Sequence, residues 1–370
     1  MSIAAIGGYL VNEPSDAEFA HVGRTLVSSA HPQPAPHRMT PGPRPRVSLV
    51  TVTFNAAGFI SPFCEAVSRL SYPALEVLIV DNASHDGTAA VLRRALPRAT
   101  VIEARRNGGF AAGCNLGAAA ASGDVLFFLN PDTRPPPEAV EPLCRPVFER
   151  RDVGAAGCKL VYPDGRLQSA GGVIGEHGFC RHRGQGEHDR GQYDSEAVVD
   201  YVPGAALAIR RGVFRELGGF HEGYFPGFYE DVELCVRLRR RGYRVLCVAA
   251  PTIEHLENQS IGPTLPYSVR RNRMLFLARN ADPEHPYRAL GREASRLYRA
   301  HVRPLLAALL GAHPWKLRDA WRDWRPALPG DLAGFALALL AARRTGPHGA
   351  PGPDRSRILC SPAAPDGQDR

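Results

Sequence analysis

The sequence has almost no lysine: Lys159 and Lys316 are the only two, so nearly all of its 45 basic residues are arginine. Alanine, glycine and proline are abundant as well, which indicates that genome composition contributes to the formal net charge of +8. Arginine from this source is weak evidence for a basic surface that binds nucleic acid. We therefore expect no nucleic-acid partner.

Paired cysteines and long apolar runs are also missing. The eight cysteines form no C-x-x-C pair and most lie inside apolar segments, which argues against a zinc cluster or a disulfide framework and favours a reducing compartment. No segment reaches the roughly 18 apolar residues that a membrane span requires. The apolar segment 3–11 is not preceded by the positively charged n-region of a signal peptide. These features predict a cytoplasmic protein.

Strands and helices alternate through the first part of the folded region. Apolar and β-branched runs predict strands at 47–53, 75–80, 100–102 and 125–129. Helical patterns separate them at 60–70, 88–96 and about 109–121. This alternation predicts an α/β fold with a mostly parallel sheet flanked by helices.

The middle of the chain is less regular. Strands are predicted at 153–159, 205–209 and 243–248. The segment 171–193, rich in Gly, His and Arg, is predicted to be a mobile loop. Its three histidines could bind a metal, but their irregular spacing favours exposure to solvent: they are His177, His182 and His188.

Polar side chains follow three strands at their carboxyl ends: Thr53 with Asn55, Asp81 with Asn82, and Asn130 with Asp132. In open α/β sheets that edge is where ligands bind. A carboxylate there, such as Asp132, suits a divalent cation that also binds phosphate oxygens, although it could instead cap the turn into the prolines that follow. The polar residues at these three strand ends together predict a nucleotide pocket.

A glycine-rich loop supports this prediction. Gly108 and Gly109 open a helix, where backbone N–H groups suit a phosphate, whereas Gly113 could simply pack the helix against the sheet. The spacing is not the G-x-G-x-x-G of a dinucleotide site, and the loop follows the third strand rather than the first.

A second signal lies further along the chain. An aromatic loop, 223–229, runs into Glu230-Asp231 and then a helical pattern. Asp231 could cap that helix, act as a general base beside rings that stack on a sugar, or do both. His255 ends another apolar run and is open to a structural role or to metal ligation.

Six blocks in fixed order resemble the family 2 glycosyltransferases, most closely their bacterial rhamnosyltransferase-like branch. The blocks are Thr53-x-Asn55, Asp81-Asn82-x-Ser84-x-Asp86-Gly87-Thr88, Asn107-x-Gly109-Phe110, Asn130-Pro131-Asp132, Glu230-Asp231-x-Glu233-Leu234, and His255 with Ser260. The resemblance covers residues 47–280 and implies a GT-A catalytic domain. It also implies inverting transfer of a sugar, with L-rhamnose as one candidate, from a dTDP- or UDP-sugar. The acceptor would be a hydroxyl of a saccharide or lipid-linked molecule in cell-surface polysaccharide assembly.

The resemblance also implies roles for single residues. Asp132 and His255 would hold Mg²⁺ or Mn²⁺, Asp231 would be the catalytic base, and Glu230 would position the acceptor. The nucleotide sugar would contact Thr53, Asn55, Asp81, Asn82, Ser84, Asn107, Gly109 and Asn130. Asn130 replaces the first aspartate of the family's D-x-D motif, which weakens the negative charge offered to a metal.

Two other functions compete with this interpretation. The protein could bind a nucleotide sugar without transferring it, because Asn130 weakens metal capture. It could also be a nucleotidyltransferase, but that chemistry needs a basic residue directly after the first strand, and the loop 54–58 has none.

The two ends of the chain differ in composition from the part between them. Residues 1–46 are predicted to be a proline-rich linker or disordered segment, and residues 346–370 a disordered tail. Between 281 and 345 we expect a helical appendage with arginines at helical spacing. Two interpretations stay open for it: packing on the catalytic domain, or peripheral contact with the inner face of the plasma membrane.

Overall fold

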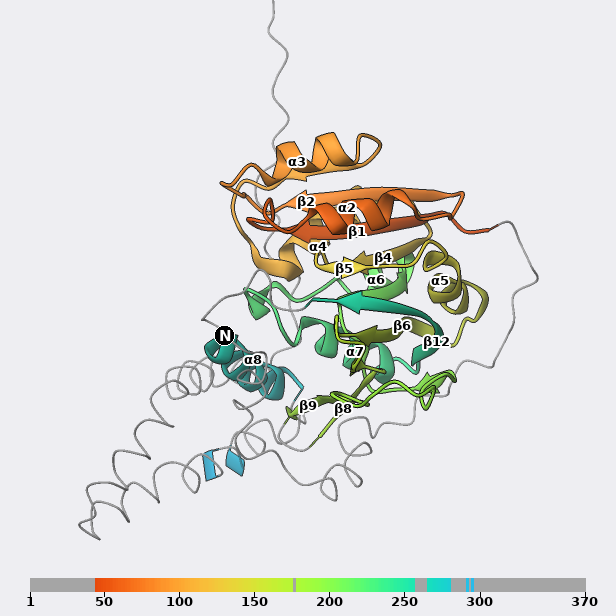
Figure 1. Ribbon diagram of the computed structural model, residues 1–370. Helices are drawn as coiled ribbons and strands as arrows, with labels where there is room; N and C mark the ends of the chain where they lie inside the picture. The colour runs from red at the N-terminus through yellow and green to blue at the C-terminus, as the bar shows by residue number, and fades with distance from the viewer. Residues whose placement is uncertain (1–43, 176–177, 257–264, 281–290, 293, 296–370) are drawn as a thin grey trace, which may run out of the picture.

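The computed structural model describes residues 44–175, 178–256, 265–280, 291–292 and 294–295. A ten-stranded mixed sheet forms its centre, with the main order β10-β12-β6-β11-β4-β1-β2-β3. Its strands are β1 (Val47–Thr53), β2 (Leu75–Asp81), β3 (Thr100–Glu103), β4 (Val125–Leu129), β5 (Thr133–Arg134), β6 (Val153–Val161), β7 (Leu167–Ser169), β10 (Ala197–Val198), β11 (Ala206–Arg210) and β12 (Arg244–His255). In Figure 1 they run from β2 near the top to β6 and β12 lower in the molecule.

Helices cover both faces of this sheet. Those within the described ranges are α2 (Ser61–Ser68), α3 (Thr88–Ala95), α4 (Gly109–Ala120), α5 (Val140–Glu149), α6 (Arg211–Glu216), α7 (Glu230–Arg240) and α8 (Leu265–Arg279), with a 3₁₀ turn, η4 (Glu222–Tyr224). None of these helices combines the length and apolar character that crossing a bilayer requires.

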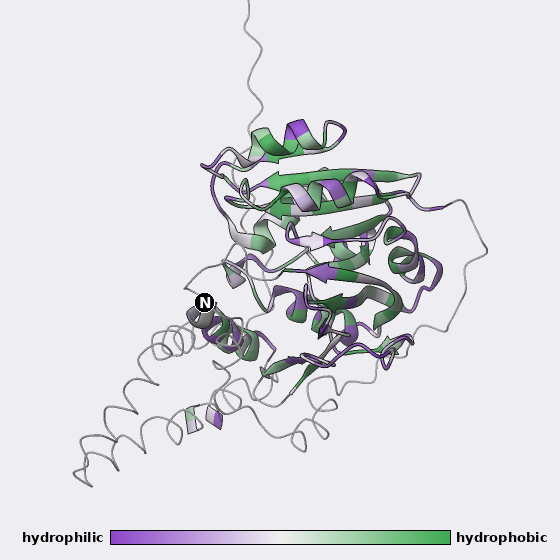
Figure 2. Ribbon diagram, viewed as in Figure 1, coloured by the Kyte–Doolittle hydropathy of each residue, from purple (hydrophilic) through white to green (hydrophobic). Residues whose placement is uncertain are grey.

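Strand β4 lies in the middle of the sheet, and all of its residues are buried. Leu126 and Phe128 enter a core shared with α4, α6 and α7, whereas Val125, Phe127 and Leu129 enter a second core shared with α2 and α5. Because both faces are covered, the strand shows no alternation with polar residues. The central strands are accordingly green in Figure 2.

The first four strands confirm the predicted parallel sheet. β1 pairs in parallel with both β2 and β4, and β2 with β3. The mixed character comes from β11, which runs antiparallel to β4 and β6, and from the short strands β5, β7 and β10, which pair antiparallel with β12 or β6. A predicted role for Gly113 is also confirmed: a Cβ at this position would lie 2.6 Å from Cγ1 of Val52, so α4 packs directly on β1.

The prediction of a loop over 171–193 is wrong in part. The segment contains a hairpin of β8 (Gly172–Ile174) and β9 (Cys180–His182), and the backbone of Gly172 bonds to that of Tyr201. His182 is therefore half-buried, whereas His188 is exposed as expected. Glycines interrupt the alternation that normally signals a strand, which hid the hairpin in the sequence.

The predicted strand at 243–248 is longer than expected. β12 changes register after Cys247, pairs with β6 again at Thr252 and ends at His255. Its last residues also pair with β5, so that His255 lies opposite Thr133. The predicted linker, helical appendage and tail lie almost entirely outside the described residues.

Candidate functional site

The ends of β1 and β2 bring four predicted donor-binding residues together. Thr53 and Asp81 are partners in the β1–β2 ladder. The buried Asp81 carboxylate accepts hydrogen bonds from the Thr53 hydroxyl at 3.4 Å and from the Ser84 backbone N–H at 3.3 Å and hydroxyl at 2.5 Å. Ser84 Oγ in turn accepts from the backbone N–H of Asn55 at 2.9 Å. The β1–α2 and β2–α3 loops are thereby held as one unit.

The glycine loop before α4 is held by two asparagines. Asn82 Nδ2 donates to Asn107 Oδ1 and to the Gly109 carbonyl, both at 3.0 Å. In return, the Gly108 N–H donates to Asn82 Oδ1 at 3.1 Å and the Gly109 N–H to Asn107 Oδ1 at 2.9 Å. Both asparagines therefore fix the shape of the loop, Asn107 from within it and Asn82 from the end of β2.

This network corrects one expectation. The N–H groups of Gly108 and Gly109 already have protein partners, and the N–H of Phe110 donates to the Pro226 carbonyl at 2.8 Å. None of these three N–H groups is left for a phosphate. Gly109 serves close approach instead: its φ is +81°, and a Cβ would lie 2.8 Å from the Pro226 carbonyl oxygen. Its contact with the nucleotide sugar stays a prediction.

Asp132 and His255 meet although they are far apart in sequence. His255 Nε2 lies 3.2 Å from Asp132 Oδ1 and 3.5 Å from Asn130 Nδ2, and both the histidine and the aspartate are buried. On the other side of the ring, His255 Nδ1 lies 2.6 Å from Gln168 Oε1. An amide oxygen can only accept, so Nδ1 carries a proton and Nε2 is the ring nitrogen that faces Asp132.

These atoms fit a divalent cation. Asp132 Oδ1 and Asn130 Oδ1 are buried without hydrogen-bond partners, and His255 Nε2 lies 3.2 Å from Asp132 Oδ1, so two orphaned oxygens and an imidazole nitrogen lie close together. In the described part of the chain no three His, Cys, Asp or Glu side chains form a metal cluster. The candidate set therefore depends on the amide oxygen of Asn130, and the set comprises one carboxylate, one amide and one imidazole.

Asp231 lies at the start of α7, as predicted. Its two oxygens accept from different backbone N–H groups, Gly204 at 2.8 Å and Val232 at 2.7 Å. Burial raises the pKa of Asp231 above its ordinary value, while these two hydrogen bonds oppose the rise. A raised pKa suits a group that must take up a proton.

Glu230 faces the interior. It is 5% exposed and its Oε2 has no hydrogen-bond partner. Burial, and to a smaller extent the charge of Asp231, raises the pKa of Glu230 well above its ordinary value. The role predicted for it, positioning of an acceptor, would require contact with a molecule outside the protein interior and stays a prediction.

A short backbone path links Asp231 to the metal candidates. Gly204, which donates to Asp231, precedes Ala205, whose carbonyl accepts from the Asn130 N–H at 3.0 Å. The carboxyl end of β4 and the start of α7 therefore lie against the same short segment. Asp231 and the Asn130–Asp132 segment therefore lie in one region at the carboxyl end of β4.

The sequence did not identify two neighbours of this region. Gln168 orients His255 but lies in a short strand with no recognisable motif. His182 was expected to be exposed, but Nδ1 of its ring lies 3.3 Å from the Tyr201 hydroxyl. Burial, with a smaller contribution from His255, lowers the pKa of His182 to about 4. Only the fold of the β8–β9 hairpin places it there.

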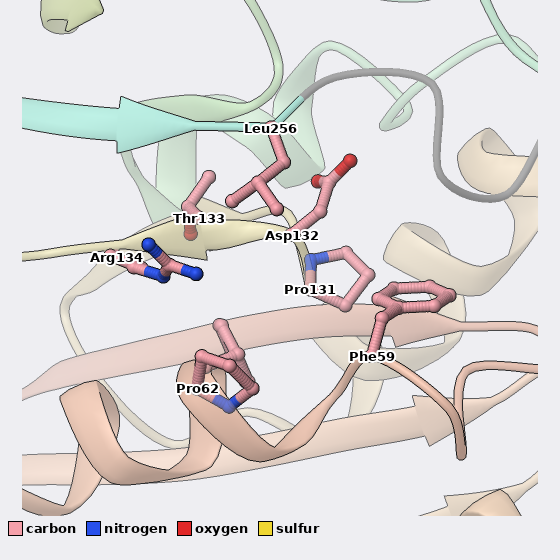
Figure 3. Close-up of a pocket in the computed structure, with 8 residues that line it drawn as sticks. Phe59, Pro62, Pro131, Asp132, Thr133, Arg134 and Leu256 are labelled. Carbon is pink, nitrogen blue, oxygen red and sulfur yellow. The ribbon is translucent and has the colours of Figure 1, made fainter. Parts of the chain in front are cut away.

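A hollow of about 210 Å³ lies beside Asp132, between the start of α2 and β5. Its lining is mainly apolar: Phe59, Pro62, Phe63, Pro131, Asp132, Thr133, Arg134 and Leu256. Figure 3 shows the Asp132 carboxylate pointing away from the Arg134 guanidinium.

Comparison with known proteins identifies the class. Residues 48–218 match the model of glycosyl transferase family 2, the family that the sequence motifs resemble. It is 32% identical over 257 residues to the O-antigen biosynthesis protein RfbC of Myxococcus xanthus, covering 65% of this chain and 20% of that protein. It is 26% identical over 237 residues to the N-acetylglucosaminyl-diphospho-decaprenol L-rhamnosyltransferase of Mycobacterium tuberculosis, covering 58% and 77%.

The structural comparison supports the fold. The crystal structure of GalNAc-T7 with UDP, GalNAc and Mn²⁺ matches with a TM-score of 0.51 and 17% identity, over 63% of this chain and 47% of that one. The predicted GT-A fold, a mostly parallel sheet between helices, is confirmed. The chain spans only a fifth of the Myxococcus protein and a quarter of another relative from Sinorhizobium fredii.

Proposed function

We propose that this chain is a glycosyltransferase that moves a sugar from a nucleotide-diphosphate donor to an acceptor hydroxyl with inversion at the anomeric carbon. The observation that carries the proposal is the convergence at one sheet edge: Asp132 lies 3.2 Å from His255, and Asp231 is linked to Asn130 through the segment 204–205.

The donor side consists of the cluster around Asp81. Its carboxylate and the neighbouring side chains of Thr53, Asn55 and Ser84 gather at the ends of β1 and β2. These polar groups offer donors and acceptors at fixed positions, as recognition of a nucleotide base and ribose requires. The family resemblance of the motifs makes a dTDP- or UDP-sugar the expected donor, and the name of the Mycobacterium relative makes L-rhamnose the candidate sugar.

Asp132, His255 and Asn130 would hold the divalent cation. Carboxylate and amide oxygens suit Mg²⁺ and Mn²⁺, and the imidazole nitrogen favours Mn²⁺ of the two. A bound cation stabilises the negative charge that develops on the diphosphate leaving group. Gln168 keeps the His255 ring in the tautomer that presents Nε2 to it.

Asp231 would take the proton from the attacking hydroxyl. Its position at the start of α7 is fixed by two backbone N–H groups, so the carboxylate needs little reorganisation when it acts. Attack from the face opposite the leaving diphosphate inverts the anomeric centre. One acting carboxylate would be enough because the diphosphate would leave without protonation.

The acceptor would be a saccharide or lipid-linked hydroxyl in cell-surface polysaccharide assembly, as the names of the Myxococcus and Mycobacterium relatives suggest. Peripheral contact with the membrane stays a prediction, since the arginine-rich segment that suggested it lies outside the described residues.

A donor panel tests the proposal. The chain is incubated with dTDP- and UDP-sugars, with and without Mn²⁺, with candidate acceptors, and release of nucleoside diphosphate is measured. We expect release from at least one donor that depends on metal and rises with acceptor. Tight binding of a nucleotide sugar without release under any condition would instead favour the inert binding protein.

A further inference from the structure

The turn that leads into α7 has an unusual backbone. Phe228 and Tyr229, directly before Glu230, have φ angles of 74° and 76°. Left-handed backbone is unfavourable for large side chains, and two such residues in succession persist only where the surroundings enforce them. Tyr229 is also the N-cap residue of α7 and makes no side-chain capping hydrogen bond. The start of the helix is therefore fixed by contacts from elsewhere.

Those contacts come from α8. Asn272 is completely buried, and its Nδ2 donates to the carbonyls of Tyr224 at 2.9 Å, Gly227 at 2.7 Å and Phe228 at 3.0 Å. Its Oδ1 accepts from Arg271 Nε at 2.9 Å. The orientation of the amide follows from this environment, because carbonyls only accept and a guanidinium only donates.

Two further hydrogen bonds hold the backbone of this turn, one from α4 and one from α8. The N–H of Phe110, in the first turn of α4, donates to the Pro226 carbonyl, and Arg271 Nη2 donates to the carbonyl of Phe225. The backbone of 224–228 is thus fixed between α4 and α8. Phe225 itself remains 45% exposed beside these contacts.

We propose that Asn272 is a positioning residue of the transfer reaction: its side-chain amide holds the left-handed turn 224–229 and thereby sets Asp231 at the start of α7. The inference rests on the proposed function for its catalytic consequence. It assigns a role to α8, which lies beyond the 48–218 segment that the family model matches.

Asn272→Asp tests the assignment because it is nearly isosteric. The variant keeps an oxygen for Arg271 but removes both N–H donors and turns an oxygen toward three carbonyls. Asn280→Asp is the matched control: Asn280 is also buried at the end of α8, but its Nδ2 donates only to the carbonyl of Phe276 in its own helix.

We expect Asn272→Asp to lower kcat by about 10- to 100-fold, since misplacement of a reacting group by about 1 Å can cost 10²-fold. The Kd for nucleoside diphosphate with Mn²⁺, measured by titration calorimetry, should change less than about threefold, because the groups around Asp81 lie on other elements. Asn280→Asp should keep both values. Equal losses in the two variants, or kcat within twofold of the native value in Asn272→Asp, would overturn the assignment.

Two further measurements keep the outcome decisive. If Asn272→Asp does not fold, Arg271→Met serves instead. It removes the hydrogen bond from the half-buried Arg271 side chain to the Phe225 carbonyl, and the same criteria for kcat and Kd apply to it. If the native chain releases no nucleotide from any donor, the proposed function is refuted, but the structural role of Asn272 can still be tested. Hydrogen exchange of the peptide 222–232 then decides: faster exchange in Asn272→Asp but not in Asn280→Asp supports the clamp, and unchanged exchange refutes it.

Discussion

Replacing Asp231 with Asn removes the proposed base while keeping its size. Loss of a positioned general base typically lowers the rate by about 10²- to 10⁴-fold, and we expect kcat to fall within that range. Binding of the nucleotide sugar should persist, because Asp231 contacts Gly204 and Val232 rather than the groups around Asp81.

The structure also predicts a cost in stability. Each Asp231 oxygen accepts from a separate backbone N–H, whereas an Asn side chain has only one oxygen and turns its NH₂ group toward the other donor. One buried N–H is then left without a partner, at about 1–3 kcal/mol in the free energy of unfolding. The variant should therefore be less stable but still folded.

A control separates the two effects. Asp152 is buried, accepts from Arg244 at 2.9 Å, and directly precedes β6, at the opposite end of that strand from the candidate site. Asp152→Asn should lose stability without losing kcat. Turnover is measured as nucleotide release at saturating donor, donor affinity by calorimetry, and stability by urea unfolding. Near-normal turnover in Asp231→Asn would show that the base lies elsewhere.

The pH dependence follows from the same residue. Burial raises the pKa of Asp231, and only the deprotonated carboxylate can accept a proton. Native turnover should therefore rise as pH increases through this raised pKa and level off above it. Turnover that is flat across the acidic range would contradict the role of Asp231.

Three further predictions concern the surroundings of the site. Gln168→Leu should weaken Mn²⁺ binding by about 10- to 100-fold in calorimetry, because it removes the partner of the imidazole Nδ1, and unchanged affinity would argue against a metal there. Glu230→Gln should gain stability over the native chain as pH rises: burial raises the pKa of Glu230, so its stabilising contribution is complete below an unfolded pKa of about 4.3 and is lost through the folded pKa. The free energy of unfolding of both proteins is measured with urea at pH 5 and pH 9, and an equal difference between them at the two pH values would contradict this prediction. Gly113→Ala should lose about 1–3 kcal/mol from overpacking on Val52, more than the gain of up to about 1 kcal/mol in helix propensity. Thermal melts should show no such loss in Gly212→Ala, whose Cβ meets nothing within 4 Å.

Sequence patterns predicted the elements whose signals are local. The uniformly apolar run of β4, the β-branched run of β1 and the polar residues at their ends each depend on a few neighbouring positions, and the structure has β1 and β4 at the predicted bounds. Short helices between strands also indicated the parallel pairing, because such a connection brings successive strands side by side in the same direction.

Long-range pairing decided the rest. His255 reaches Asp132 because β12 pairs with β6 again after a change of register, and the glycine-loop N–H groups are occupied because two asparagines and the 224–228 turn close over them. Neither arrangement has a periodic or compositional signal. The sequence by itself determined which side chains stand at the ends of strands, whereas the contacts between distant segments determined which of them meet, since hydrogen-bond geometry and packing act only after the chain has folded.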